Sequence, residues 1–210
     1  MTIHIWSDVV CPFCYIGKRH LEQAIAAFDT KEEIQLTWHS FQLDPDLKTD
    51  TTISLYDYLA REKGWPRSDV EAINARLNAS GADADIAFHF ERVVVANTYR
   101  AHALLQAARK QKKQQELGAR LFEAYFSAGK NVDDVQVLMT LATETGMDTT
   151  GLREALERDA FAESIRADLT EANRRGIGAV PHFIINGKQS ISGAQPVSVF
   201  EEALKKAGGN

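Results

Sequence analysis

Two cysteines separated by two residues constrain this chain more than any other feature. Cys11 and Cys14 are its only cysteines, and they stand between a short apolar run and a helical pattern. The run Ile3–Trp6 predicts a buried strand. Apolar residues then recur at helical spacing over Phe13–Phe28, and Pro12 suits the first turn of that helix, where its missing N–H costs nothing. The pair is therefore expected at the start of a helix that follows a strand.

A second strand and a long helical region come next. Apolar and polar residues alternate over Ile34–Phe41, as in a strand with one buried face. Strand, helix and strand in this order favour parallel strands and a right-handed crossover. The region from 44 to 173 shows no strand pattern. Its helical periodicity is clearest over 53–63, 98–109, 115–128, 135–145 and 160–174.

The end of the chain returns to strand patterns. His182–Asn186 is rich in β-forming residues, Asn186-Gly187 is typical of a two-residue hairpin turn, and Lys188–Ser192 is the expected return strand. An amphipathic helix over Val197–Lys206 follows. These patterns predict an α/β fold in which residues 1–43 and 174–210 form one discontinuous domain around a single sheet. Residues 44–173 are then a large all-helical insertion domain.

Charge and hydropathy exclude some classes of partner. The 210 residues carry a formal net charge of −5, which argues against nucleic acid or an anionic membrane as a partner. The basic run 109–113 ends a helical pattern and is interpreted as a solvated helix end, with a docking patch as the alternative. The start of the sequence shows no secretory leader pattern, and no apolar run approaches the roughly 20 residues of a membrane helix. We therefore expect a cytoplasmic protein.

The spacing of the cysteines suits thiol–disulfide chemistry. At a helix start, free backbone N–H groups and the helix dipole favour an anion, so Cys11 is the expected attacking thiolate. Cys14 lies one turn later and is the expected resolving sulfur, which attacks the mixed disulfide and releases the substrate. A structural disulfide is not expected, because the cytosol is reducing and a bridge across two residues constrains the unfolded chain little.

Two alternatives for the cysteine pair remain open. Zinc would need two more ligands, and none of the six histidines lies at finger-like spacing from the cysteines. An inert pair is the other alternative. We predict no metal and no cofactor other than the redox-active disulfide itself.

A second candidate element is Val180-Pro181, just before the strand pattern at His182. A proline there can simply open a strand, which is a permitted position. The sharper interpretation is a cis Val180–Pro181 bond that brings this turn beside the cysteines, although only about one X-Pro bond in twenty is cis in folded proteins. His182 is equally compatible with a place near the thiolate and with a packed strand position.

At this point the sequence resembles the DsbA-like thioredoxin-fold family, and within it the FrnE subgroup of mostly cytosolic proteins. The resemblance spans the whole chain. It rests on residues 7–19 around the cysteines, Asn97-Thr98 with Ala101-His102 and Leu104-Leu105, residues 121–126, Gly178-Ala179-Val180-Pro181-His182-Phe183, and Gly193-Ala194-Gln195.

The resemblance implies a thioredoxin-like fold whose helical insertion caps the active site. It also implies a cis-proline loop at Pro181, where backbone groups pair with an extended substrate. The expected substrate-binding residues are Val180 and Pro181 of that loop together with Pro12 and Phe13 between the cysteines. Further candidates are His182, Asn97 and His102.

The sequence departs from the FrnE pattern at a few positions near the cysteines. Phe13 replaces a tryptophan common in the subgroup, and His39 and His182 are less usual there. These departures bear on the reduction potential and not on the class of reaction.

The expected reaction is disulfide exchange with protein or small-thiol substrates, as a disulfide oxidoreductase or isomerase. Relatives of the same architecture, 2-hydroxychromene-2-carboxylate isomerase and kappa-class glutathione transferase, use a serine near the first cysteine position and bind glutathione. This chain keeps both cysteines, which favours dithiol chemistry, and glutathione stays an alternative thiol partner. A peptide-binding chaperone without turnover would use the same surface.

Overall fold

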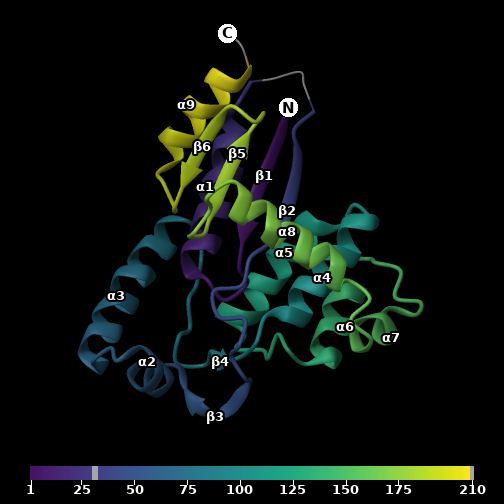
Figure 1. Cartoon of the computed structure of the whole chain (residues 1–210). Helices are drawn as coiled ribbons and strands as arrows, with labels where there is room; N and C mark the ends of the chain where they lie inside the picture. Colours follow the sequence, from purple (N-terminus) through teal and green to yellow (C-terminus); the bar gives the residue numbers. More distant parts are fainter. Residues whose placement is uncertain (30–32, 209–210) are drawn as a thin grey trace.

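A four-stranded mixed sheet organises the computed structural model, which describes residues 1–29 and 33–208 (Figure 1). The strands are β1 Thr2–Ser7, β2 Gln35–Ser40, β5 His182–Ile185 and β6 Gln189–Ser192. They lie in the order β2-β1-β5-β6. β1 pairs in parallel with β2, and β5 pairs antiparallel with both β1 and β6. The predicted α/β class is confirmed, and both ends of the chain contribute to one sheet.

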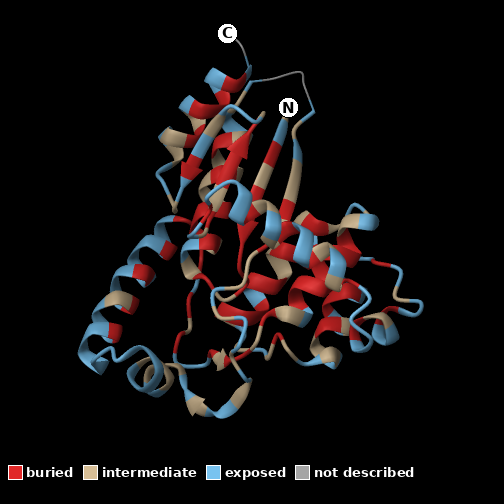
Figure 2. Ribbon diagram, viewed as in Figure 1, coloured by how far each residue is buried: buried red, intermediate tan, exposed pale blue. Residues whose placement is uncertain are grey.

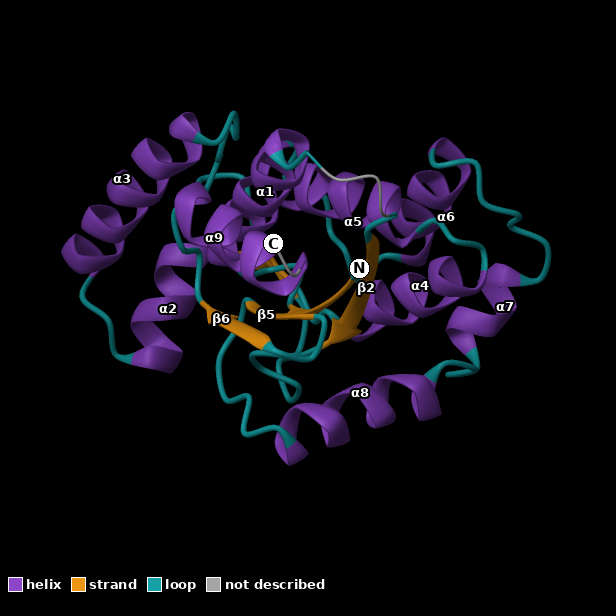
Figure 3. Ribbon diagram, turned by 90° about the horizontal axis from the view of Figure 1, so that it is seen from above, coloured by secondary structure: helices purple, strands orange, loops and turns teal. Residues whose placement is uncertain are grey.

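Helices cover both faces of this sheet. They are α1 Pro12–Ala27, α8 Ala162–Arg174 and α9 Val197–Gly208. Figure 3 shows α1 and α9 on one face and α8 on the other. The alternation of β1 explains the two layers, because Ile3 and Ile5 enter the main core while Trp6 packs with Ala172 of α8 on the opposite face.

The insertion between β2 and β5 flanks the carboxyl ends of β1 and β2. Besides α8, it holds α2 Leu55–Lys63, α3 Arg67–Asp83, α4 Tyr99–Lys110, α5 Gln114–Phe122, the π-helical turn η1 Glu123–Ser127, α6 Val135–Glu144 and α7 Leu152–Glu157. Figure 1 shows α2 and α3 on one side and α4 to α7 on the other. Leu104 and Leu121 of the insertion belong to the same buried cluster as Ile5. The division into two separate folding units stays a prediction.

The insertion is not purely helical, which corrects one expectation. β3 (Asp50–Ser54) pairs antiparallel with β4 (Val94–Val95). The β-branched residues Thr51 and Thr52 favour extended backbone. Ser54 then caps α2 by accepting a hydrogen bond from the Asp57 backbone N–H at 3.1 Å, so that helix begins at 55 instead of 53.

The sequence patterns also missed two helices and placed the start of one strand a residue too early. α3 buries only four residues, and two of them are polar or glycine. α7 has only six residues. Neither helix therefore shows a clear helical period of apolar residues in the sequence. The predicted two-residue turn is present, because Lys188 N–H donates to the Ile185 carbonyl at 3.0 Å and the two residues between them, Asn186 and Gly187, have the positive φ angles that such a turn requires, 48° and 66°. The strand pairing ends at Ile185 and Gln189, so the return strand begins at 189 instead of 188.

Candidate active site

Cys11 and Cys14 lie at the start of α1, as predicted. Cys11 precedes the first helical residue, Pro12, and its backbone N–H donates to the Asp8 carbonyl at 3.2 Å. The Cys11 carbonyl in turn accepts from the Cys14 N–H at 3.0 Å. Both side chains are free thiols, and both residues are buried, with 4% of Cys11 and 1% of Cys14 exposed. The positive end of the helix dipole therefore lies beside Cys11.

The two sulfurs have different surroundings. Burial raises the pKa of the Cys14 thiol well above its ordinary value, and the neighbouring Cys11 raises this pKa further. The Ser7 hydroxyl and the Asp8 backbone N–H oppose these effects only in part. Cys11, in contrast, lines an open groove on the protein surface. Both residues are buried, but Cys11 lines this groove and Cys14 does not, so the geometry separates a sulfur beside a surface groove from an enclosed one.

The loop before β5 lies directly against Cys11. The Val180–Pro181 peptide bond is cis, and the Cys11 thiol donates to the Val180 carbonyl oxygen at 3.7 Å. Pro181 packs on Gly17 of α1, where a Cβ atom would stand 3.1 Å from the Pro181 ring. The absence of a side chain at Gly17 is therefore what lets this loop approach the helix.

His102 supports the segment that precedes the cysteines. Its Nε2 atom lies 3.2 Å from a carboxylate oxygen of Asp8, and both residues are almost completely buried. The other Asp8 oxygen accepts from the Leu43 backbone N–H at 2.8 Å. The pair ties the segment around Asp8, just before the cysteines, to α4 and to the chain after β2. Its contacts assign His102 a positioning role behind the site and no contact with either sulfur.

Asn97 and His182 are not brought to the sulfurs by any contact among the described residues. The Asn97 side chain donates to the carbonyls of Pro45 and Leu47 at 3.2 and 2.7 Å, so it braces the segment after β2. His182 Nε2 lies 2.9 Å from the Ser190 hydroxyl, and its ring meets the edge of Trp6 on the face that carries α8. These contacts favour the packed-strand interpretation of His182.

An apolar groove of about 780 Å³ opens beside Cys11 and extends between residues 10–13 and the elements α2, α3 and η1. We call it the client groove. Three large hydrophobic residues are exposed among those that the structure describes, Phe13 at 49%, Leu43 at 51% and Trp65 at 45%, and all three line this groove. Figure 2 shows that α3, which forms its far wall, is exposed along most of its outer side. Exposed apolar side chains that gather in one place mark a binding surface.

Of the four predicted substrate-binding residues, three line the client groove together with Cys11: Pro12, Phe13 and Val180. Pro181 is buried behind them against α1. Sequence reasoning missed Leu43 and Trp65, and the only signal for Trp65 was a large aromatic residue beside the helix-breaking Pro66.

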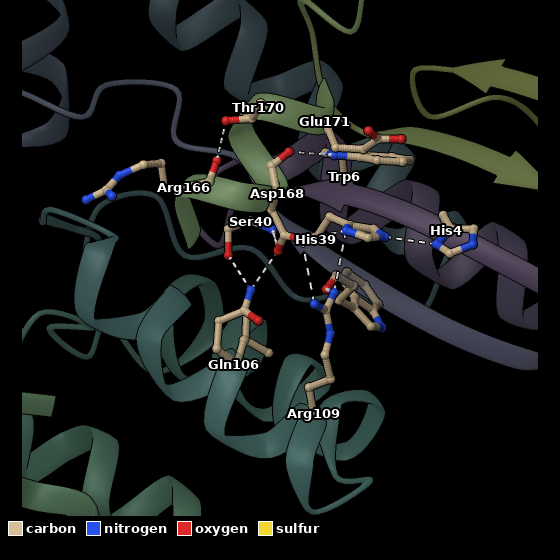
Figure 4. Close-up of polar contacts among 12 residues, drawn as sticks. His4, Trp6, His39, Ser40, Gln106, Arg109, Arg166, Asp168, Thr170 and Glu171 are labelled. Carbon is tan, nitrogen blue, oxygen red and sulfur yellow. Dashed lines mark hydrogen bonds and ion pairs between the residues drawn. The ribbon is translucent and has the colours of Figure 1, made fainter. Parts of the chain in front are cut away.

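A polar cluster apart from the cysteines joins α8, β2 and α4, and it centres on the buried carboxylate of Asp168 in α8 (Figure 4). This carboxylate accepts hydrogen bonds from His39 Nδ1 at 2.6 Å, from the Ser40 backbone N–H at 2.8 Å and from Gln106 Nε2 at 2.6 Å. Arg109 lies 3.6 Å away. Burial alone would raise the pKa of Asp168, but the His39, Ser40 and Arg109 contacts outweigh it and hold this pKa below its ordinary value.

The cluster continues from His39 to His4 on β1. Since a carboxylate only accepts hydrogen bonds, His39 Nδ1 carries the proton. In the neutral ring, His39 Nε2 then accepts from His4 Nδ1 at 2.9 Å. Burial lowers the pKa of His4, and the nearby His39, Arg175 and Arg109 lower it further. Burial also lowers the pKa of His182.

These two histidines predict a loss of stability in mild acid. The pKa of each is lower in the folded chain than its unfolded value of about 6.5, so between the two values the unfolded chain binds more protons. The stabilisation is complete above about pH 6.5 and is lost as pH falls through the folded pKa values. Urea unfolding across this range is expected to show a falling free energy of unfolding, with a shallower slope in His4→Gln. An equal slope in both proteins would contradict the assignment.

Two further findings concern the described part of the chain. No group of three His, Cys, Asp or Glu side chains there is arranged to hold a metal ion. None of the helices within 1–29 and 33–208 combines the length and apolar character needed to cross a membrane.

Comparisons with known proteins identify the family of this chain. The model of the DSBA-like thioredoxin domain family matches residues 2–205. The uncharacterized protein YwbO of Bacillus subtilis is 30% identical over 207 residues, which cover 97% of this chain and 96% of that protein. The crystal structure of a probable DsbA oxidoreductase from Streptomyces coelicolor is 31% identical, with 100% of this chain and 91% of that chain covered and a TM-score of 0.91.

A more distant structure shares the fold alone. The cytosolic disulfide reductase DsbM of Pseudomonas aeruginosa is 18% identical, with 98% of each chain covered and a TM-score of 0.66. The family match over nearly the whole length and the two relatives at 30% identity or more are what decide the assignment. The chain belongs to the DSBA-like thioredoxin domain family of thiol oxidoreductases.

Proposed function

We propose that this protein exchanges disulfides with protein or peptide substrates through Cys11 and Cys14. One observation carries the proposal: Cys11 stands at a helix N-terminus and at the edge of the client groove, while Cys14 is enclosed one turn behind it. A sulfur that meets substrates and a second one that only its neighbour can reach are what a two-step exchange requires.

The proposed reaction has two steps. The Cys11 thiolate attacks a client disulfide, one client sulfur leaves as a thiolate, and a mixed disulfide forms. Cys14 then attacks the Cys11 sulfur, the bond to the client breaks, and the Cys11–Cys14 disulfide forms. In the oxidising direction the same steps run in reverse. The net direction follows from the reduction potential of the pair against its surroundings, where about 30 mV corresponds to a tenfold change in the equilibrium constant.

The client groove supports a peptide as the preferred substrate. Its lining is dominated by apolar side chains, and Phe13, Leu43 and Trp65 give it exposed anchors for a client side chain. The Val180 backbone at its edge suits strand-like pairing with an extended client while the client disulfide meets Cys11. Glutathione is proposed as a second, small thiol partner that needs no groove.

The remaining proposals concern subgroup and location. We retain membership of the FrnE subgroup and a cytoplasmic location, with neither nucleic acid nor membrane as a partner. The net charge of −5 supports the choice of partners, and the fold shared with a reductase described as cytosolic supports the location.

Turnover tests the proposed reaction. Reduction of a fluorogenic peptide disulfide, with dithiothreitol as the electron donor, is expected for the wild-type chain. Cys11→Ser is expected to fall to the uncatalysed rate, because a neutral hydroxyl does not replace the thiolate. Ser192→Ala, an exposed change on β6, serves as the control and is expected to keep full activity. A wild-type chain that binds the peptide without turnover would instead be a peptide-binding chaperone.

The groove predicts a preference that a single substitution can remove. For a peptide with apolar residues beside its disulfide, Trp65→Ala is expected to raise KM by about ten- to a hundredfold, since a buried aromatic contact contributes about 1.5–3 kcal/mol. Reduction of glutathione disulfide is expected to be unchanged, and Trp65→Phe is the matched control. An unchanged KM for the peptide would place it outside the client groove, and equal losses with both substrates would show a general effect of the substitution instead of a peptide contact.

A further inference from the structure

Ser7 is a buried polar residue that the proposed reaction does not yet use. β1 alternates, so Ile3, Ile5 and Ser7 all point into the core that α1 covers. Ser7 is the last residue of β1 and lies near the first turn of α1. Its hydroxyl is close enough to the Cys14 thiol to lower the pKa of that thiol. The Ser7 oxygen nevertheless completes no hydrogen bond of normal geometry with any described residue.

A small cavity adjoins this hydroxyl. It has room for about one water molecule, about 10 Å³, and is bounded by Ser7 and Ser40 at the ends of β1 and β2, Leu105 of α4 and Gly118 of α5. The Ser40 hydroxyl accepts from Gln106 Nε2 at 2.9 Å, so its own hydrogen is free to point elsewhere. Ser7 and Ser40 are the two lining residues that carry a hydroxyl group, and a buried water requires at least two polar partners.

Gly118 keeps this space open. A Cβ atom at Gly118 would meet Trp38 at 3.9 Å and Leu105 at 4.0 Å, which are ordinary van der Waals distances, and nothing closer. A methyl group therefore fits, and it would take up room in the cavity. The glycine has no positive φ angle that would oppose the change.

We propose that one water bound in this cavity joins Ser40 to Ser7, and that the Ser7 hydroxyl thereby donates a hydrogen bond to the Cys14 thiolate. The inference rests on the proposed exchange reaction and adds a catalytic residue to it. The hydrogen bonds of this proposed series all run in one direction. Each group donates to the next, from the Gln106 amide through the Ser40 hydroxyl, the water and the Ser7 hydroxyl to the Cys14 sulfur. Donors aligned in this way polarise one another and strengthen the last bond.

The bond acts where the charge of Cys14 changes. In the resolving step, Cys14 releases its proton to water and its thiolate attacks the Cys11 sulfur, while the client leaves as a thiolate and takes up a proton. In the reverse direction, Cys14 is the leaving thiolate. Burial disfavours that charge in both directions, and the Asp8 backbone N–H is the other donor that offsets it.

A chromogenic disulfide separates the two steps. With 5,5′-dithiobis(2-nitrobenzoate), attack by Cys11 releases one coloured thiolate, and attack by Cys14 releases a second in a later phase. In Ser7→Ala the second phase is expected to be about tenfold slower near neutral pH and to recover as pH rises, because a hydrogen bond to a charged group is lost. The first phase is expected to be unchanged, which also shows that the variant is folded.

Gly118→Ala tests the water without touching Ser7. It is expected to slow the second phase severalfold, although the protein becomes more stable, because alanine favours the helix over glycine. Ser192→Ala is the control. An unchanged second phase in Ser7→Ala would overturn the inference, and an unchanged second phase in Gly118→Ala alone would overturn the role of the water. If the wild-type chain shows no second phase at all, the proposed function fails together with the inference.

Discussion

A Cys14→Ser variant is expected to accumulate covalent mixed disulfides with its clients, whereas a Cys11→Ser variant is expected to accumulate almost none. The difference follows from access to the two sulfurs. In the proposed reaction Cys11, which borders the client groove, attacks first, so without Cys14 the mixed disulfide has no internal route to resolution. Cys14 is 1% exposed, and burial raises the pKa of its thiol well above the ordinary value, so alone it is a poor nucleophile.

Non-reducing electrophoresis of the two variants, each mixed with a thiol-containing peptide and an oxidant, measures this difference. Most of the Cys14→Ser protein is expected in a heavier band that disappears with dithiothreitol. The double variant that lacks both sulfurs is the matched control for non-covalent adhesion. Equal trapping by the two single variants would show that the roles of attacking and resolving sulfur are wrongly assigned.

The elements closest to the site were predictable because their signals are local. Cys11, Pro12 and Cys14 open a helix after a strand, and each residue type there has a backbone reason to occupy its position. The place of Pro181 followed from a resemblance instead, since a strand opener would produce the same pattern. The short pair β3 and β4 escaped detection because its partners lie about forty residues apart and neither strand is long enough to show a period.

The supporting residues could not be predicted because their roles are set by tertiary contacts. In the sequence, Asp168 looks like one more solvent-exposed carboxylate of a helix. No residue near it in the sequence indicates that β2 and α4 contact it in the fold. In the sequence, Leu43 and Trp65 look like ordinary apolar residues. Only the structure shows that both are exposed and line the groove beside α2 and α3. Ser7 is informative only once a cavity and a buried sulfur are found beside it.

Asp168→Ala is expected to reduce the free energy of unfolding by about 3–5 kcal/mol, the range for breaking a buried ionic contact. The carboxylate accepts from three buried or partly buried donors, His39 Nδ1, the Ser40 backbone N–H and Gln106 Nε2. Each unpaired buried donor costs about 1–3 kcal/mol, and partial relaxation keeps the total below their full sum.

The same contacts join parts of the chain that are distant in sequence. Asp168 comes from α8, Gln106 from α4, and His39 and Ser40 from the edge strand β2, so the loss of one side chain releases the insertion from the sheet edge (Figure 4). Urea unfolding at neutral pH measures the effect, and Asp46→Ala, at an exposed carboxylate, is the matched control with an expected change within about 0.5 kcal/mol. The wild-type chain should also approach the stability of the variant as pH falls through the lowered pKa of Asp168, because the carboxylate then becomes neutral. A loss below about 1 kcal/mol at neutral pH would mean that water replaces the carboxylate at all three donors.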